Sequence, residues 1–174
     1  MDELAIRDAI AADAAAIATI YGHHVLYGTA SYDVVPPLAE YHRARIERVT
    51  AEGWPFLVAE RSGAIAGYAY ATQFRDRDAY RFTAEDSIYV HPDWLRQGVG
   101  GALLDALIER SVTFGFRTLI AVIGGADPAS IRLHASRRFR EVGRLNAVGW
   151  KHERWLDSVY MQLEMRPAGA STGG

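Results

Sequence analysis

Hydrophobic positions recur along the chain with two periods, which predict a mixture of strands and helices. Short apolar runs rich in β-branched and aromatic residues predict strands at 4–7, 56–60, 64–71, 87–90, 118–123, 139–145 and 158–165. Apolar residues three and four positions apart predict helices through Ile17, Ile20, Tyr21, His24 and Val25, at about 38–51, at 102–114 and from Asp127 onward. This order is typical of a single α+β domain, residues 1–166. The small and polar residues 167–174 predict a disordered tail.

Local signals mark the ends of these elements. Ser62-Gly63 predicts the turn of a β-hairpin, and Gly115 predicts the end of a helix. Asp8 or Asp13 is placed to cap the first helix. Asp127 followed by proline is typical of a helix start.

The predicted helix at 38–51 is amphipathic. Its apolar side carries Tyr41, Ile46 and Val49. Its charged side carries Arg43, Arg45, Glu47 and Arg48. A charge run of this kind is typical of a solvated face, so we expect these four side chains to point outward.

A glycine-rich turn joins the strand at 87–90 to the helix that follows. It consists of Arg96, Gln97, Gly98, Val99, Gly100 and Gly101. Backbone N–H groups and the helix dipole attract phosphate at such a turn, and glycine lets the phosphate approach closely. The sequence lacks the Gly-Lys-Ser/Thr of a P-loop, and Leu103 replaces the third glycine of a dinucleotide fingerprint. An ordinary tight connection between strand and helix remains the alternative.

Composition removes several classes of function. The chain has 174 residues, of which 49% are hydrophobic, and a net charge of −2, so it can bury a core and shows no sign of binding nucleic acid. It has no cysteine, which excludes disulfides, thiolate metal sites and a cysteine nucleophile. We expect a cytoplasmic protein without a membrane segment. The spacing of His23, His24, His42, His91 and His152 predicts no metal site.

Several segments resemble one known family. They are Gly28 to Asp33, Gly67 to Ala71, Ala79 to Glu85, Ser87 to Val90, the glycine-rich turn, Ala129 to His134, Val148 to His152 and Arg154 to Asp157. Together they resemble the GNAT-fold N-acetyltransferases, specifically the group that acetylates phosphinothricin, methionine sulfone or methionine sulfoximine. The resemblance implies a mixed, mostly antiparallel twisted sheet flanked by helices. It also implies a homodimer, in whose interface or core we place Trp150 and Trp155 rather than in a base-stacking platform.

The resemblance implies acetyl-CoA as co-substrate and no metal. Its pyrophosphate is expected on the turn at 96–101 and its pantetheine arm beside Ile88, Tyr89 and Val90. The Val90 N–H is expected to stabilise the oxyanion formed at the thioester. The cofactor residues that the resemblance implies also include Asp127 and Ser136.

Two catalytic residues follow from the same resemblance. Glu85 matches the general base that takes a proton from the attacking amine, directly or through a water. The alternative for Glu85 is a solvated strand end. His134 either protonates the leaving CoA thiolate or only packs and hydrogen-bonds there.

The acceptor residues are expected in and near the arginine-rich segment. They are Phe74, Arg75, Arg77, Tyr80 and Arg81, together with Tyr32. Arginine suits a small amino acid that carries a carboxylate and a sulfone, sulfoximine or phosphinate. The alternative is that the alternating arginines and aspartates pair only with one another.

Three positions depart from the family pattern. Leu95 stands where the loop usually begins with Gln or Arg, and Asp127 replaces a usual Asn, which adds negative charge near a polyanion. Arg138 replaces a usual glycine, with strain on the order of 1 kcal/mol if its φ is positive.

From the resemblance as a whole we predict acetyl transfer to the primary amine of a small amino acid analogue. The alternatives are another amine (a polyamine or a protein N-terminus) or a non-catalytic acyl-CoA-binding module.

Overall fold

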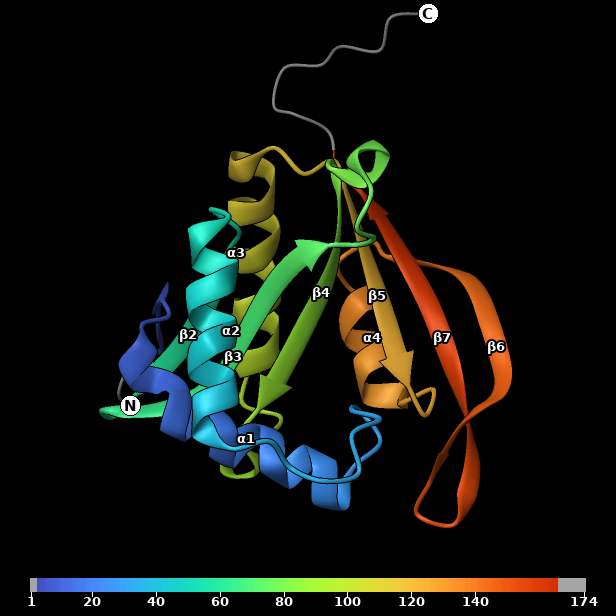
Figure 1. Cartoon of the computed structure of the whole chain (residues 1–174), viewed down its shortest axis with the longest axis horizontal. Coiled ribbons are helices and arrows are strands. Elements are labelled where there is room, and N and C mark those ends of the chain that lie inside the picture. Colours follow the sequence, from blue (N-terminus) through green and yellow to red (C-terminus); the bar gives the residue numbers. More distant parts are fainter. Residues whose placement is uncertain (1–2, 166–174) are drawn as a thin grey trace, which may run out of the picture.

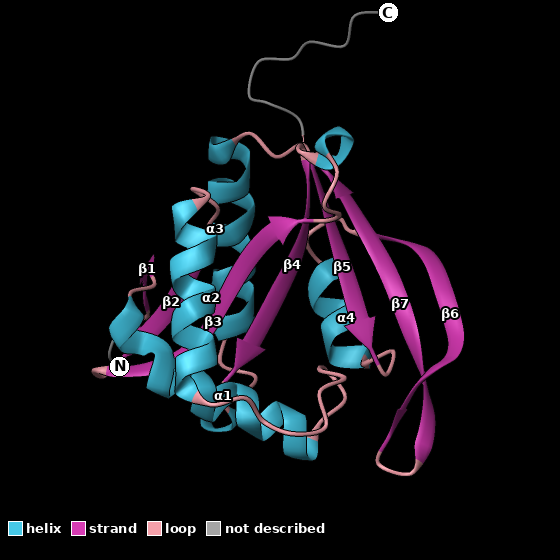
Figure 2. Ribbon diagram, in the orientation of Figure 1, coloured by secondary structure: helices cyan, strands magenta, loops and turns pink. Residues whose placement is uncertain are grey.

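The chain folds around one mixed sheet of seven strands (Figure 1, Figure 2), seen in a computed structural model that describes residues 3–165. The strands are β1 (Ala5–Asp8), β2 (Phe56–Arg61), β3 (Ala64–Gln73), β4 (Thr83–Val90), β5 (Thr118–Gly124), β6 (Arg140–Lys151) and β7 (Arg154–Glu164). Their order across the sheet is β1-β2-β3-β4-β5-β7-β6. Neighbouring strands are antiparallel except β4 and β5, which are parallel. The predicted α+β class and mostly antiparallel mixed sheet are confirmed.

Helices cover both faces of this sheet. The helices α1 (Ala14–Tyr27) and α2 (Ala39–Ala51) lie on one face, and α3 (Val99–Phe114) and α4 (Pro128–Ala135) on the other (Figure 1). Successive strand residues point to opposite faces, so Phe56 and Val58 pack with α1 and α2, whereas Leu57 and Ala59 pack with α3. Two hydrophobic clusters, one on each face, hold the layers together.

The parallel strands β4 and β5 separate part-way along their length. Their pairing covers only Thr83–Asp86 against Thr118–Ala121, and beyond it the two strands diverge (Figure 1). The N–H of His91 donates to the carbonyl of Ala66 on the β3 side, at 2.9 Å. Because hydrogen bonding alternates along an antiparallel ladder, the N–H groups of Ile88 and Val90 face the gap instead. The sheet thus leaves an open row of backbone groups inside the molecule.

Most of the predicted boundaries are confirmed. The hairpin between β2 and β3 turns at Ser62-Gly63, and Gly115 ends α3 with φ +115. The carboxylate of Asp127 accepts from the Ser130 N–H at 2.8 Å, as a capping residue should. Arg138 has φ +67 just after α4, so the expected left-handed strain is present.

Two local predictions were wrong. On α2, Tyr41 is 46% exposed and His42 is 1% exposed, because His42 lies four residues before Ile46 and so falls on the apolar stripe. Neither Asp8 nor Asp13 caps α1 by a side-chain bond; Asp13 accepts from the Ile10 N–H instead.

The last hairpin is longer than predicted. The strands β6 and β7 continue to Lys151 and from Arg154, because their ends pair beyond a register shift near Gly149. The predicted tail, residues 167–174, lies outside the described residues, and the domain boundary at residue 166 stays a prediction.

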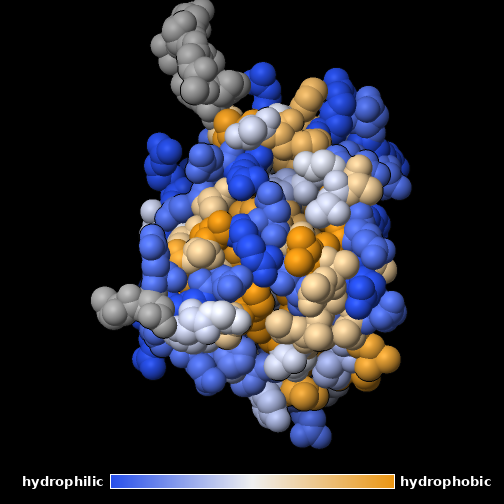
Figure 3. All heavy atoms as spheres, turned by 90° about the vertical axis from the view of Figure 1, so that its left-hand side faces the viewer, coloured by the Kyte–Doolittle hydropathy of each residue, from blue (hydrophilic) through white to orange (hydrophobic). Residues whose placement is uncertain are grey.

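The face of the molecule shown in Figure 3, which is the left-hand side of Figure 1, carries hydrophilic residues together with several apolar areas. This agrees with the amphipathic character of α2, whose outer side carries Arg43, Glu47 and Arg48. Arg45 departs from the predicted solvated face, because it is only partly exposed and lines a cavity.

Candidate active site

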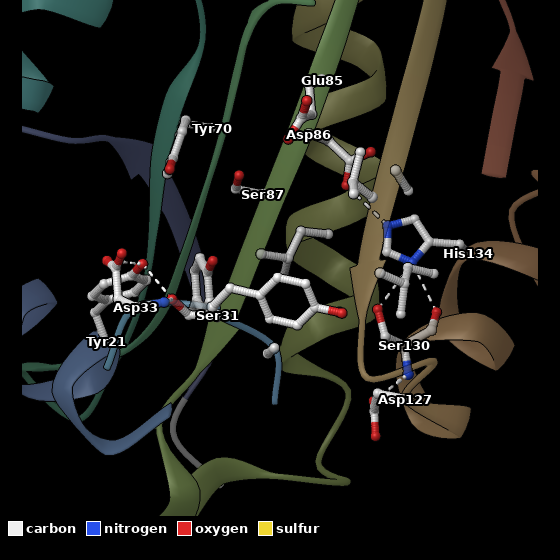
Figure 4. A pocket seen from close by; sticks show the side chains of 18 of the residues that line it. Tyr21, Ser31, Asp33, Tyr70, Glu85, Asp86, Ser87, Asp127, Ser130 and His134 are labelled. Atoms are coloured by element: carbon white, nitrogen blue, oxygen red, sulfur yellow. Dashed lines mark hydrogen bonds and ion pairs between the residues drawn. The ribbon is translucent and has the colours of Figure 1, made fainter. Parts of the chain in front are cut away.

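Two cavities meet at the gap between β4 and β5. The larger, of about 600 Å³, is lined by the glycine-rich turn and the N-terminal end of α3. The smaller, of about 320 Å³, lies between α1, α2 and the diverging strands (Figure 4). Their linings share Ala30, Ile88, Asp127 and Ser130. A ligand in one cavity can therefore contact a ligand in the other.

The larger cavity is built to hold a phosphate-bearing ligand. Gly98 precedes α3 with φ +84, a conformation that side chains rarely adopt, and a Cβ there would project into open space. The first turn of this 16-residue helix contains no acidic residue, so its N–H groups present undiminished positive potential. Arg96 adds positive charge to the lining, which also contains Arg137 in an ion pair with Asp105. These residues fit the pyrophosphate of a coenzyme A derivative.

The predicted cofactor residues divide between the two cavities. The larger is lined by Ile88, Val90, Arg96, Gly98, Val99, Gly100, Gly101 and Asp127, and by Leu95 as well. Tyr89 lines the smaller cavity instead. Gln97 and Ser136 line neither, since Gln97 bonds the Asp93 carbonyl and the Ser136 hydroxyl donates to Leu133.

Val90 is held by a histidine on α1. The Nε2 atom of His24 lies 2.8 Å from the Val90 carbonyl oxygen, which can only accept, so this nitrogen carries the proton. Burial lowers the pKa of His24 and keeps the ring neutral. The carbonyl of Val90 is thereby occupied, while its N–H faces the gap.

Glu85 lines the smaller cavity from β4, close to where the strands part (Figure 4). Burial raises the pKa of this carboxyl above its ordinary 4.5, and the negative charge of Asp86 raises it further. The positive charge of Arg75 opposes the shift. A carboxylate whose pKa is moved toward neutrality in a cavity is suited to general base catalysis.

His134 and Asp86 form a buried pair beside Glu85 (Figure 4). Nδ1 of His134 lies 2.8 Å from the Ser130 carbonyl oxygen, and Nε2 lies 2.9 Å from Oδ2 of Asp86. Both partners are acceptors, which favours a ring protonated on both nitrogens. Burial opposes this charge, but the Asp86 carboxylate outweighs it and the pKa of His134 is raised. The second carboxylate oxygen of Asp86 has no partner among the described residues.

Comparison with known proteins decides the family. The model of the acetyltransferase (GNAT) family matches residues 17–139. The chain belongs to the GNAT acetyltransferase family. It is 50% identical over 161 residues to a phosphinothricin N-acetyltransferase of Alcaligenes faecalis, covering 92% of this chain and 81% of the relative. It is 38% identical over 162 residues to an L-methionine sulfoximine/L-methionine sulfone acetyltransferase of Salmonella typhimurium, covering 93% and 95%.

Solved structures agree with this assignment. A GNAT superfamily phosphinothricin acetyltransferase from Sinorhizobium meliloti, in complex with AcCoA, matches with TM-score 0.92 and 45% identity, covering 98% of this chain and 93% of that one. Within residues 3–165, no helix is both long and apolar enough to cross a membrane. The same residues contain no group of three or more His, Cys, Asp or Glu side chains that could hold a metal ion.

Of the predicted acceptor residues in this GNAT chain, only Tyr32 lines the smaller cavity. Phe74, Arg75, Arg77, Tyr80 and Arg81 lie outside both cavity linings. The Arg75 guanidinium lies over the Phe74 ring, 3.9 Å from its centroid, and Arg81 pairs with Asp78 at 3.2 Å. Self-pairing therefore holds for Arg81, whereas Arg75 and Arg77 have no carboxylate partner among the described residues. Their role toward an acceptor stays a prediction.

Other lining residues were missed in the sequence. Those with polar side chains are Tyr21, Ser31, Asp33, Arg45, Tyr70, Asp86, Ser87 and Ser130. The alternation of β4 was a usable signal for Ser87, since it shares a face with Glu85. No local pattern marked Arg45, because its approach to the cavity depends on how α2 packs over β3.

The loop that carries Tyr32 is tied to the β6–β7 hairpin. The Tyr32 hydroxyl donates to the Asp157 carbonyl at 2.8 Å and accepts from the Gly125 N–H at 3.2 Å. Lys151, which is 4% exposed, donates to the Ser31 carbonyl at 2.6 Å, and burial lowers its pKa. One wall of the smaller cavity thus depends on contacts with distant parts of the chain.

Proposed function

We propose that this GNAT protein transfers the acetyl group of acetyl-CoA to the primary amine of a small amino acid analogue of the phosphinothricin, methionine sulfone or methionine sulfoximine type. The observation that carries the proposal is the meeting of the two cavities at the β4–β5 gap, with Glu85 on the acceptor side. The names of the similar enzymes supply the acceptor class.

The larger cavity is the proposed acetyl-CoA site. The N–H groups at the start of α3 hold the pyrophosphate, and the open backbone row of Ile88 and Val90 holds the pantetheine arm. Bound acetyl-CoA supplies an acetyl group activated as a thioester. The Val90 N–H points toward the gap, where it donates to the acetyl oxygen as negative charge develops.

The smaller cavity is the proposed acceptor site. A primary amine is mostly protonated at neutral pH, so a base must remove a proton before the amine can attack. Glu85 is the proposed base, acting directly or through a water, and its raised pKa suits this role. The reaction needs no covalent intermediate on the enzyme.

His134 is the proposed source of the proton for the leaving thiolate. It lines the smaller cavity next to the shared residue Ser130, and the raised pKa keeps more of it protonated near neutral pH. Asp86 positions the ring from the opposite side. If His134 only packs, its replacement should change stability more than turnover.

We also propose that the chain forms a homodimer, in agreement with the notable exposure of its last hairpin. The rings of Trp150 and Trp155 pack edge to face, 5.2 Å between centroids, and are 57% and 63% exposed. Of the two predicted positions, this exposure excludes the core and leaves an interface, which would bury the two rings. Light scattering of the parent and of Trp155→Ser tests the assignment. The cytoplasmic location stays a prediction.

The test of function is release of CoA thiol from acetyl-CoA with a panel of amines. The panel contains methionine sulfone, methionine sulfoximine, phosphinothricin, ordinary amino acids, a polyamine and a short peptide. We expect turnover with the first three. Turnover confined to the polyamine or peptide would move the proposal to another acceptor. Binding of acetyl-CoA without turnover on any amine would favour a non-catalytic acyl-CoA-binding module.

A further inference from the structure

Arg45 reaches from α2 to the smaller cavity, although Arg43, Glu47 and Arg48 on the same helix are exposed. Its side chain is partly buried and lines the cavity with Tyr70 and Ser87. Nη1 donates to the Tyr70 hydroxyl at 2.5 Å, and Nη2 donates to the Tyr41 hydroxyl. The guanidinium also lies over both rings, 4.7 Å from the Tyr41 centroid and 5.5 Å from that of Tyr70. Two aromatic side chains therefore hold it in one position.

The hydrogen bonds of Arg45 do not neutralise its charge. A guanidinium carries five N–H donors, and here two of its nitrogens donate to uncharged phenol oxygens. No carboxylate among the described residues forms an ion pair with it, in contrast to Arg7, Arg110 and Arg137. A partly buried cation without a counterion is costly to maintain. This arrangement leaves donors and a full positive charge available to a ligand.

The smaller cavity is lined by charges of both signs, and Arg45 supplies a positive one. Of the described residues that line the smaller cavity, Arg45 alone is an arginine or lysine, while Asp33, Glu85, Asp86 and Asp127 are acidic. Tyr70 is directly opposite Ser87 in the sheet, and Glu85 lies two residues from Ser87 on the same face of β4. That separation along a strand is about 6.6 Å. The cavity therefore offers a positive end at Arg45 and a negative end at Glu85.

We infer that Arg45 binds the carboxylate of the acceptor, and that it makes the enzyme selective for amines with a neighbouring carboxylate. The inference rests on the proposed function and deepens it. An amino acid bound with its carboxylate on Arg45 directs its amine toward Glu85 and the gap. Planar N–H donors suit a carboxylate, whereas a lysine offers only a point charge.

The competing role for Arg45 is structural. Its bonds to Tyr41 and Tyr70 also fasten α2 to β3, so a variant could lose activity through a loosened helix. The two roles differ in one respect. A binding role acts only on acceptors that have a carboxylate, whereas a loosened helix affects all acceptors alike.

The test compares methionine sulfone with its carboxamide, in which the carboxylate becomes an uncharged amide. We expect the parent to prefer the free acid, and Arg45→Gln to lower kcat/KM for the acid on the order of 100-fold while changing the amide less than about threefold. Arg45→Lys should lower kcat/KM for the acid about tenfold and leave that for the amide unchanged. This variant replaces Arg45→Gln in the test if the Gln variant folds poorly. Arg43→Gln is the matched control, because it removes an arginine of α2 that is outside both cavity linings. Thermal melting of each variant checks the fold.

The outcomes separate this inference from the proposed function. A parent enzyme that acetylates acid and amide equally well leaves the proposed function standing and overturns the role of Arg45. Equal losses on acid and amide in the Arg45 variants overturn it as well, in favour of the structural role. Acetylation of a polyamine but of neither methionine sulfone nor its amide contradicts the proposed acceptor class, and the inference with it.

Discussion

Asp86 and His134 are 48 positions apart in the chain, yet Nε2 of His134 lies 2.9 Å from Oδ2 of Asp86 in a buried pair. The contact joins β4 to α4 across the region where β4 and β5 begin to separate. It therefore fixes the position of the catalytic candidates on both sides of the gap.

Asp86→Asn should lower the pKa of His134, because an amide removes the negative charge that favours the imidazolium ion. Since that pKa is raised in the folded chain, the pair stabilises the fold fully below pH 6.5, and this contribution is lost as pH rises through the folded pKa. We expect the free energy of unfolding of the parent to fall over this range and that of the variant to lack the fall. Urea denaturation from about pH 6 to about pH 9, with NMR titration of His134, measures both.

The control for this variant is Asp78→Asn, which removes an exposed ion pair with Arg81. Such a pair contributes less than about 1 kcal/mol, so neither the titration of His134 nor the pH dependence should change. An Asp86→Asn protein whose His134 titrates as in the parent would contradict the buried ion pair.

Glu85→Gln should lower turnover about 10²- to 10⁴-fold and leave the affinity for acetyl-CoA nearly unchanged. The carboxyl must be ionised to accept a proton, so parent turnover should rise with pH through a pKa above 4.5. The turnover of the variant should not show this rise with pH. Initial rates against pH and calorimetry with acetyl-CoA check the two expectations. Unchanged turnover would remove Glu85 as the base, and Glu40→Gln on the exposed side of α2 is the control for lost charge.

Gly98→Val should weaken acetyl-CoA binding at least about tenfold, because a branched side chain would project into the space that the pyrophosphate needs. Gly63→Val is a matched control. Gly63 has φ +75 against φ +84 for Gly98, and a Cβ at either residue meets nothing within 4 Å, but Gly63 lies in a hairpin turn. Both variants should lose similar stability and only one should lose affinity. Calorimetry measures the acetyl-CoA affinity of both variants, and equal affinities would place the phosphate site elsewhere.

Gly149→Ala should impair the acceptor site from a distance. Its Cβ would lie 2.7 Å from Cε2 of Tyr32, whose ring is pinned by hydrogen bonds to Asp157 and Gly125. We expect a stability loss of about 1–3 kcal/mol and a raised KM for the amine. Gly143→Ala, on the same strand, meets nothing within 4 Å and should change neither quantity. Retained KM in the Gly149 variant would show that Tyr32 does not shape the acceptor site.

The sequence predicted those parts of the fold and site that depend on local patterns. The strand, glycine turn and helix around Gly98 follow one another within twenty residues, and the Asp127 cap needs only its own helix. The phase of α2 was misjudged because tyrosine and histidine are both amphipathic, and only the packed sheet decides that His42 is the buried one.

Contacts between distant segments lay beyond such patterns. Arg45 meets Tyr70 across 25 positions, and Tyr32 meets Asp157 across 125. In the sequence, a charged residue on an exposed helix looks the same whether its side chain ends in solvent or at a cavity formed with a neighbouring strand. The resemblance to a family singled out Glu85, which lines the smaller cavity, whereas the charge argument for an anionic acceptor chose Arg75, Arg77 and Arg81, which lie outside both linings.

The open row of backbone groups on β4 also connects the stability of the folded chain to binding of the acyl donor. Beyond Asp86 and Ala121 the strands β4 and β5 no longer pair, so the N–H groups of Ile88 and Val90 face the larger cavity instead of a strand. Any ligand that pairs with those groups stabilises the folded form by mass action, by about 2.7 kcal/mol at a hundredfold excess over its dissociation constant. The amount of intact enzyme in a cell would then follow the supply of its own acyl donor, so starvation for that donor would lower both the rate of the reaction and the lifetime of the catalyst.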